Sequence, residues 1–210
     1  LRQIATPTVD SRFDERQYAM VTVDGDAAGF TGDQTLPFAA DRQRRTAAFA
    51  LSVQGNILTG ESVLDRLEAG FLEEACDLPE RLMRSVEAGG TATEGDSRCT
   101  PGLPADAAYL QVDRPDEPAG SYLVLQVQGA RTDPVRELRR QFDRWRVNHP
   151  CVPVVGSVEG PSMPEPTAPP ARAGGCTCGA GSEPGPPWRA GAVLSALLFL
   201  GLRRVRQRQG

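Results

Sequence analysis

The 210-residue sequence contains no lysine and a single histidine, His149. A Ser-His-Asp triad needs a histidine as its base, and His149 lies beside Pro150 after the last predicted helix, which favours a mobile surface position. The body of the sequence also lacks phosphate-binding glycine loops, dinucleotide-binding fingerprints and paired zinc-ligand motifs. These absences argue against histidine-dependent hydrolases, nucleotide-binding enzymes and zinc proteins, and we expect neither a cofactor nor a metal site.

Basic charge is scarce in the larger part of the chain. All 23 basic residues are arginine, and six of them lie in residues 171–210, which hold one acidic residue. The part before residue 171 therefore carries a clear excess of acidic side chains. A protein that binds nucleic acid needs the opposite balance, so nucleic acid is not an expected partner.

Long apolar runs are missing except for residues 190–202. At about 1.5 Å per residue, a helix of this segment would extend about 20 Å, less than the roughly 30 Å hydrocarbon core of a membrane. The arginines after it would stay on the cytoplasmic side, so the rest of the chain would lie on the outer side of the inner membrane. We predict a short transmembrane segment. The alternative, a core helix with a basic end, is disfavoured because residues 153–189 offer little for it to pack against.

The chain divides into four parts by composition. Residues 1–15 are polar and lack periodicity, so we interpret them as a linking segment at a truncated N-terminus. Residues 16–151 carry the apolar periodicity of a domain. Nine of the eighteen prolines lie between residues 153 and 187, so we predict a disordered Pro-rich stalk over residues 152–173. Residues 174–210 follow as a separate C-terminal part.

Residues 174–210 resemble the myxobacterial C-terminal sorting tag. A small-residue motif containing Cys176 precedes a Gly/Pro spacer, the apolar segment 190–202 and an arginine cluster. This is the order of tails that are cut and exchanged for an anchor. The resemblance implies a sortase-like membrane protease as partner and Cys176 as the sorting or lipid-attachment residue. The precursor would be held in the inner membrane and the processed protein displayed at the cell surface or anchored in the outer membrane. Export also leads us to expect a signal peptide upstream of Leu1.

Residues 16–151 predict an α+β fold with helices packed on an antiparallel sheet. Asp24 and Gly25 form the expected turn of a β-hairpin. Asp77 is the predicted N-cap of a helix with Pro79 in its first turn, and Asp133 caps the last helix. The polar stretch 32–46 is given no element. The predicted strands are 18–23, 27–31, 48–54, 107–112 and 122–127, and the predicted helices are 61–75, 77–89 and one that starts at 134.

Two polar clusters are the candidate binding residues. Gln54, Gly55 and Asn56 follow a strand expected to be central, where amide groups and a glycine allow a ligand to approach closely. The alternative is a turn into the next helix. Asp96 and Arg98 lie in a second polar loop, for which the alternative is a solvated turn.

Five segments carry a further resemblance: residues 16–32, 49–60, 78–89, 95–98 and 133–142. Together they look like successive blocks of an uncharacterised bacterial family, the Ntn-hydrolase-like domain of unknown function ten twenty-eight. The resemblance implies the αββα sandwich of N-terminal-nucleophile hydrolases. In these enzymes a Thr, Ser or Cys at the start of the first strand attacks an amide, with its own α-amine as base. That strand precedes the matched portion, so no residue of this sequence is assigned as the nucleophile.

The resemblance implies a surface-displayed amide hydrolase with its nucleophile upstream of Leu1. The alternative is a non-catalytic surface module that binds a ligand or a protein on the same fold, and a homo-oligomer remains open. The sequence also departs from the family pattern: relatives tend to have a Trp-Ala-Gly-His run after the hairpin, where this chain has Phe38, Ala39, Ala40 and Asp41.

Cysteine usage fits an exported protein. A Cys76–Cys99 disulfide would close a loop across the second predicted helix and contribute about 3 kcal/mol in the chain-entropy model. Cys151 is then left over. Three alternatives stay open: Cys99 pairs with Cys151, one thiol pairs with an N-terminal part, or all three are reduced.

Overall fold

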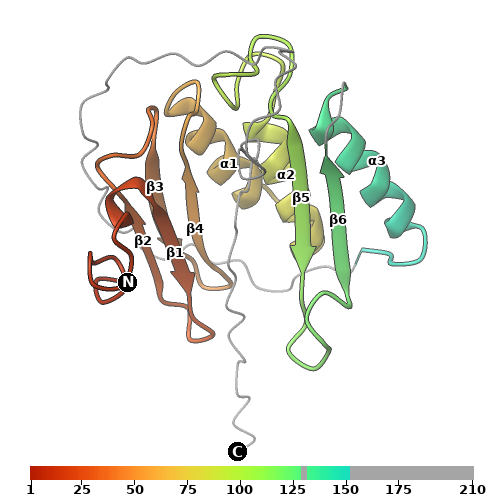
Figure 1. The fold of residues 1–210 in the computed structure, drawn as a ribbon. Coiled ribbons are helices and arrows are strands. Elements are labelled where there is room, and N and C mark those ends of the chain that lie inside the picture. Colours follow the sequence, from red (N-terminus) through yellow and green to blue (C-terminus); the bar gives the residue numbers. More distant parts are fainter. Residues whose placement is uncertain (129–131, 152–210) are drawn as a thin grey trace, which may run out of the picture.

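The structure is a computed structural model that describes residues 1–128 and 132–151 (Figure 1). The predicted stalk and sorting tag, including Cys176 and the segment 190–202, lie outside the described residues. Among the helices that are described, none has the length and apolar character needed to cross a membrane.

The described chain forms three antiparallel β-hairpins and three α-helices after a short 3-10 helix, η1 (Phe13–Glu15). The hairpins are β1 (Gln17–Val21) with β2 (Ala27–Thr31), β3 (Ala40–Arg45) with β4 (Ala50–Gly55), and β5 (Ala107–Val112) with β6 (Leu123–Gln128). The helices are α1 (Ser62–Leu72), α2 (Leu78–Gly89) and α3 (Pro134–Arg146). This arrangement confirms the mixed class with antiparallel strands and the order of all predicted elements.

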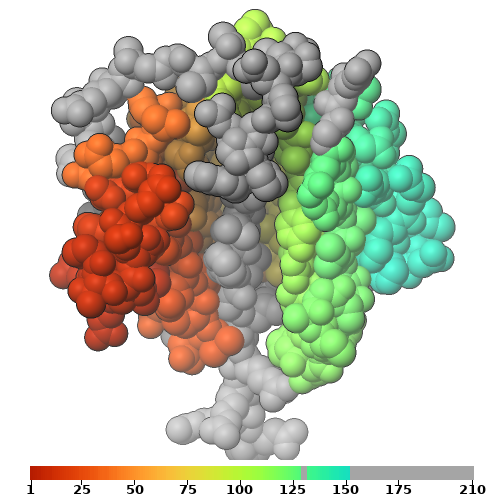
Figure 2. Space-filling view, viewed as in Figure 1, coloured from red at the N-terminus to blue at the C-terminus, as the bar shows by residue number. Residues whose placement is uncertain are grey.

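The β1–β2 hairpin forms a layer on one side of β3–β4, and the helices lie on the other side (Figure 1). Alternate side chains of β3 show the two faces, because successive strand residues point in opposite directions. Arg44 pairs with Glu68 of α1 at 2.9 Å, whereas Asp41 accepts a hydrogen bond from Thr31 of β2 at 2.5 Å. Figure 2 shows the N-terminal part of the chain, which includes β1 and β2, at the viewer's surface on one side of the molecule, and β5 and β6 at that surface on the other side.

Strand β3 was not predicted from the sequence, because it has no apolar alternation. Its residues are Ala, Asp, Arg, Gln, Arg and Arg. The polar side chains find partners on both faces, so a half-buried strand forms without an apolar side. Strand β4 is the reverse case: its first five residues, Ala50 to Gln54, are all buried, as the sequence predicted.

The core lies between β4, β5, β6 and the helices. Phe49 meets Phe71 of α1 edge to face with ring centroids 5.5 Å apart. Leu138 and Phe142 bury the inner side of α3 against β5 and β6. Helices α1 and α2 pack closely at Gly70, where a Cβ atom would lie 2.8 Å from the Cβ of Ala88.

The helix starts agree with the predicted caps. Asp77 accepts a hydrogen bond from Glu80 N at 3.0 Å at the start of α2. Asp133 accepts from Val135 N at 2.9 Å at the start of α3. The Glu80 carboxylate does not complete a capping box but pairs with arginines, including Arg139 of α3, so it joins two helices.

Candidate functional site

The two polar clusters singled out in the sequence belong to loops that contact each other. Leu58, in the connection after β4, forms an isolated antiparallel bridge with Asp96, in the connection after α2. Ser97 N donates a hydrogen bond to Ile57 O at 2.8 Å. The fold therefore brings both clusters to the same end of the molecule, the end at which α2 finishes (Figure 1). We call this the loop end.

The turn after β4 is held by backbone bonds to two other segments. Ile57 adopts a φ of 57°, a left-handed conformation that is rare for a β-branched residue. Its N–H donates to Leu36 O at 3.1 Å, and Leu58 N donates to Phe38 O at 3.1 Å. Because three chain segments fix this geometry, Asn56 leaves the strand in a defined direction.

Gln17 of β1 orients Asn56 and joins the two β-layers. Its Nε2 atom donates to Thr31 Oγ1 at 3.0 Å, Ala40 O at 3.1 Å and Gly55 O at 3.0 Å. Its Oε1 atom accepts from Asn56 Nδ2 at 2.9 Å. Gln17 was not predicted from the sequence. Its only sequence signal is a polar amide at the first position of a strand whose pairing partner, Thr31, is also polar.

Asp41 extends this network deeper between the layers. Gln43 Nε2 donates to Asp41 Oδ2 at 2.8 Å and to Ser52 Oγ at 3.2 Å. The layers approach closely here, since a Cβ atom on Gly29 of β2 would lie 2.1 Å from Asp41 Oδ2. Asp41 occupies the position where the resemblance expects a histidine, and it serves as a hydrogen-bond acceptor for a hydroxyl and an amide.

Gln54 is the buried residue of the cluster whose bonding is incomplete. The residue is 9% exposed, and its Oε1 atom has no hydrogen-bond partner among the described residues. Gln54 pairs with Asp41 across the β3–β4 ladder, so its side chain stands on the face that carries the network. Leaving a buried acceptor unmet costs about 1–3 kcal/mol. Gln54 Oε1 is therefore a buried acceptor that lacks a donor among the described residues.

Asp96 and Arg98 form one unit in the second loop. Asp96 is 3% exposed; its Oδ1 accepts from Arg98 N and Nε, both at 2.9 Å, and its Oδ2 accepts from Nη2 at 2.5 Å. Gly95 precedes the pair with a φ of 144°, and a Cβ atom there would lie 2.2 Å from Pro104 O. The backbone at this point therefore requires glycine, and the buried carboxylate is held by the arginine beside it.

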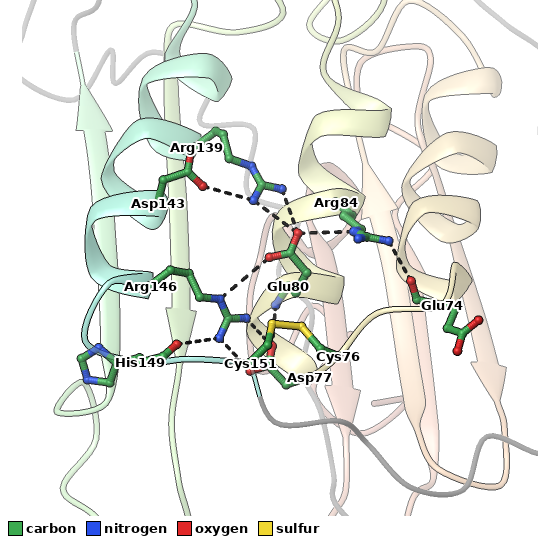
Figure 3. Close-up of a disulfide and its surroundings, with 10 residues drawn as sticks. All are labelled: Glu74, Cys76, Asp77, Glu80, Arg84, Arg139, Asp143, Arg146, His149 and Cys151. Atoms are coloured by element: carbon green, nitrogen blue, oxygen red, sulfur yellow. Dashed lines mark hydrogen bonds and ion pairs between the residues drawn. A yellow bond between two sulfur atoms is a disulfide. The ribbon is translucent and has the colours of Figure 1, made fainter.

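The start of α2, at the other end of the molecule, carries the disulfide, and we call this the disulfide end. Cys76 is bonded to Cys151 with Cα atoms 5.5 Å apart (Figure 3). This corrects the predicted Cys76–Cys99 pairing. A helix rises about 1.5 Å per residue and a disulfide needs Cα atoms within about 7 Å, so α2 keeps Cys76 and Cys99 apart. Cys99 lies with its Sγ 3.5 Å from Asp106 Oδ1.

His149 also lies at the disulfide end. Its ring stacks on Trp145 with centroids 4.2 Å apart, and its Nδ1 is 2.8 Å from Trp145 O. Cys76, Asp77 and Cys151 place three potential metal-ligand atoms within 4.8 Å of one another, but two of these atoms are bonded to each other. The one histidine of the chain is thus separated from the loop end by the length of α2.

Comparison with known proteins gives a family and a fold. The sequence model of the family described as "Family of unknown function (DUF1028)" matches residues 3–138. Among solved structures, the chain is similar to protein SPO2555 from Silicibacter pomeroyi, whose crystal structure is assigned to DUF1028. The TM-score is 0.53 at 21% identity over 69% of this chain and 58% of that chain. This chain thus spans little more than half the length of that relative. No curated protein matches the sequence.

Proposed function

The chain belongs to the DUF1028 family, whose function is unknown, and from this premise we propose that the loop end is the substrate-recognition part of an amide hydrolase. In this proposal the substrate contacts Gln54, Gly55 and Asn56. The Asp96–Arg98 pair forms the neighbouring part of the same site. As in N-terminal-nucleophile hydrolases, the nucleophile would be the N-terminal residue of the mature enzyme. It lies outside the described residues. The unmet acceptor on Gln54 is the observation that carries the proposal.

The chemistry of the cluster suits an amide-bearing ligand. An amide presents both an N–H donor and a carbonyl acceptor, and Gln54 Oε1 lacks a donor. Sites built to hydrogen-bond a substrate N–H discriminate strongly against analogues without one, because the buried partner would be left unpaired. Gln17 and Asn56 hold each other in place, so the amide groups at the exit of β4 are preorganised for such a ligand.

Replacement of Gln54 tests the recognition role in the natural full-length protein. A panel of N-acyl amino acids, short peptides and cell-wall fragments would be assayed for hydrolysis. Gln54→Met keeps the length of the side chain and removes the amide, so we expect about a tenfold or larger loss in kcat/KM with an unchanged or higher Tm. Gln126→Met on the exposed side of β6 is the matched control and should leave turnover unchanged. Equal activity of both variants would remove Gln54 from the site.

A non-catalytic binding module is the second candidate. It is favoured by the position of His149, which stacks on Trp145 at the disulfide end and so supplies no base at the loop end. The two candidates differ in one measurement: a module raises its Tm with a ligand that it does not consume. Hydrolysis of that ligand by the full-length protein, abolished by blocking its N-terminal amine, would decide for the enzyme.

We also propose that the protein is exported and sorted through its C-terminal tag. A disulfide in the described domain suits an oxidising compartment, and the order of the features around Cys176 suits a processed tail. Mass spectrometry of the protein from native membranes would identify its N-terminus and show whether the chain continues past Cys176. An intact, reduced chain in the cytosol would contradict the proposal.

A further inference from the structure

The described domain ends in a short segment, residues 147–151, that follows α3. Its hydrogen bonds within the described chain are local. Asn148 N donates to Trp145 O at 3.2 Å, and His149 N donates to Arg146 O at 3.1 Å. These bonds curl the segment onto the last turn of α3 but do not attach it to α2.

Two links tie this segment to α2 within the described residues (Figure 3). The first is the covalent bond between Cys76 and Cys151. The second is Arg146, whose Nη1 donates to Asp77 Oδ2 at 2.8 Å and to His149 O at 3.1 Å. Because Asp77 is the N-cap of α2, both links converge on the start of that helix.

The two links differ in their access to solvent. The side chains of Arg146 and Asp77 are 13% and 14% exposed, and the Arg146 guanidinium lies over the Phe142 ring, 4.8 Å from its centroid. Cys151 is exposed and Cys76 is half-buried. A reagent in solution can therefore reach the disulfide at Cys151, while the ion pair stays sheltered.

We propose that the Cys76–Cys151 bond is a reducible clamp that a dithiol reductant opens. A thiolate of the reductant attacks Cys151 Sγ, the S–S bond breaks, and Cys76 leaves as a thiolate. The second thiol of the reductant then attacks the mixed disulfide and releases Cys151 as a thiolate. The reductant departs as its own disulfide after supplying both electrons, and the cysteine thiolates take up protons from water.

The surroundings favour this direction of attack. Cys76 immediately precedes the N-cap of α2, and the positive end of a helix dipole stabilises a negative charge there. The carboxylate of Asp77 would oppose that charge, but Arg146 pairs with it. Cys151 is the more exposed of the two residues, so a bulky reductant approaches the disulfide from its side.

Opening the clamp moves the point at which the chain leaves the domain. In the oxidised protein residue 151 is fixed at the start of α2. In the reduced protein the Arg146–Asp77 pair still docks the end of α3, and Arg146 and Trp145 still hold His149. Residues 150 and 151 lose their link to α2. The device concerns the disulfide end and does not depend on the function proposed for the loop end.

Hydrogen exchange of the full-length protein before and after dithiothreitol tests the clamp. We expect the amide of Cys151 to exchange about tenfold faster or more after reduction. Asn148 and His149, whose amides are bonded to α3, should change less. Amides of α1 and β4 should be unchanged. Equal exchange of the Cys151 amide in the two states would overturn the proposal, because the disulfide would then not be what holds this residue. Peptide-resolved mass spectrometry keeps Cys176 and Cys178 from confusing the result.

A monothiol reductant tests the direction of attack. Under conditions that trap the mixed disulfide, mass spectrometry should find the adduct on Cys151 and a free thiol at Cys76. An adduct mainly on Cys76 would overturn the assigned direction. The Cys76→Ser/Cys151→Ser variant is the matched control: its amide at position 151 should exchange fast from the start and show no response to reductant.

Discussion

The two ends of α2 are held by different kinds of contact. At the disulfide end a few strong links converge on one turn: the bond from Cys76 to Cys151 and the ion pair from Asp77 to Arg146. At the loop end the chain is fixed by many backbone hydrogen bonds between connections, such as the bridge of Leu58 with Asp96. The first end gains strength from side-chain chemistry, and the second gains a defined backbone shape that can present ligand-binding groups.

This difference implies that the ends can be perturbed separately. Helix α2 is twelve residues long, which corresponds to about 18 Å. Mutations at sites more than about 10 Å apart with no shared partner usually have additive effects. Damage at the disulfide end should therefore lower global stability without altering the shape of the loop end, and the following predictions test this separation.

Removal of the disulfide should have the largest effect on stability. Cys76→Ser/Cys151→Ser opens a loop of 75 residues, for which the chain-entropy model gives a loss of about 4 kcal/mol. Urea unfolding measures the loss. Cys99→Ser, at a cysteine outside this bond, should cost far less. Binding of a ligand that requires Gln54 should persist below the new Tm; loss of binding in the folded variant would show that the two ends are coupled.

Arg81→Met should lower the free energy of unfolding by about 3 kcal/mol, because it leaves buried carbonyl groups without a hydrogen-bond donor. Arg81 is 4% exposed, and its Nη1 donates to Phe71 O at 3.0 Å and Glu73 O at 2.7 Å. It thereby closes the C-terminus of α1 against α2, and this burial lowers the pKa of its guanidinium.

Arg84→Met is the control for Arg81. Arg84 makes a similar bond to Glu74 O at 2.7 Å, but its side chain is 40% exposed, so water can replace it. We expect a loss below about 1 kcal/mol. Equal losses in the two variants would mean that burial does not decide the strength of these helix-end contacts.

Local sequence signals predicted the helix starts and most strands, since these depend on neighbouring residues. Asp77 and Asp133 cap their helices as predicted, and Gly25 provides the turn of the first hairpin with a φ of 85°. Strand β3 could not be predicted because its polar residues become half-buried only through partners on α1 and β2. The Cys76–Cys151 pairing likewise depends on where α3 ends in space.

The candidate site was predictable only in part. The strand exit at Gln54 and Asn56 could be recognised from the sequence, as could the polar loop with Asp96. That Gln17 orients Asn56 could not, because 39 residues separate them and nothing in either segment indicates their register. The buried state of Gln54 also depends on β1–β2 lying over β4, which is a tertiary property.

Gly95→Ala should lower the free energy of unfolding by about 2 kcal/mol through its effect on the loop end. The new Cβ would lie 2.2 Å from Pro104 O at a φ of 144°. Gly102→Ala separates strain from collision, because Gly102 has a φ of 124° with no atom within 4 Å of a new Cβ. We expect only Gly95→Ala to weaken ligand binding at the loop end. If Gly102→Ala costs as much, backbone strain alone accounts for the effect.

Asp10→Asn should have the smallest effect, because Asp10 belongs to neither end of α2. A hydrogen bond from Arg12 N and another from the Tyr18 hydroxyl lower the pKa of its carboxyl group in the folded protein. A lowered pKa contributes stability above the unfolded value, roughly pH 4, and this contribution disappears as the pH falls through the folded value. Urea unfolding should therefore show a small gap in stability between wild type and variant at pH 7, and this gap should close as the pH falls through the lowered folded pKa of Asp10. A gap that widens in acid would contradict the assignment, and a loss comparable to that of the disulfide variant would show that the N-terminal segment supports α2 after all.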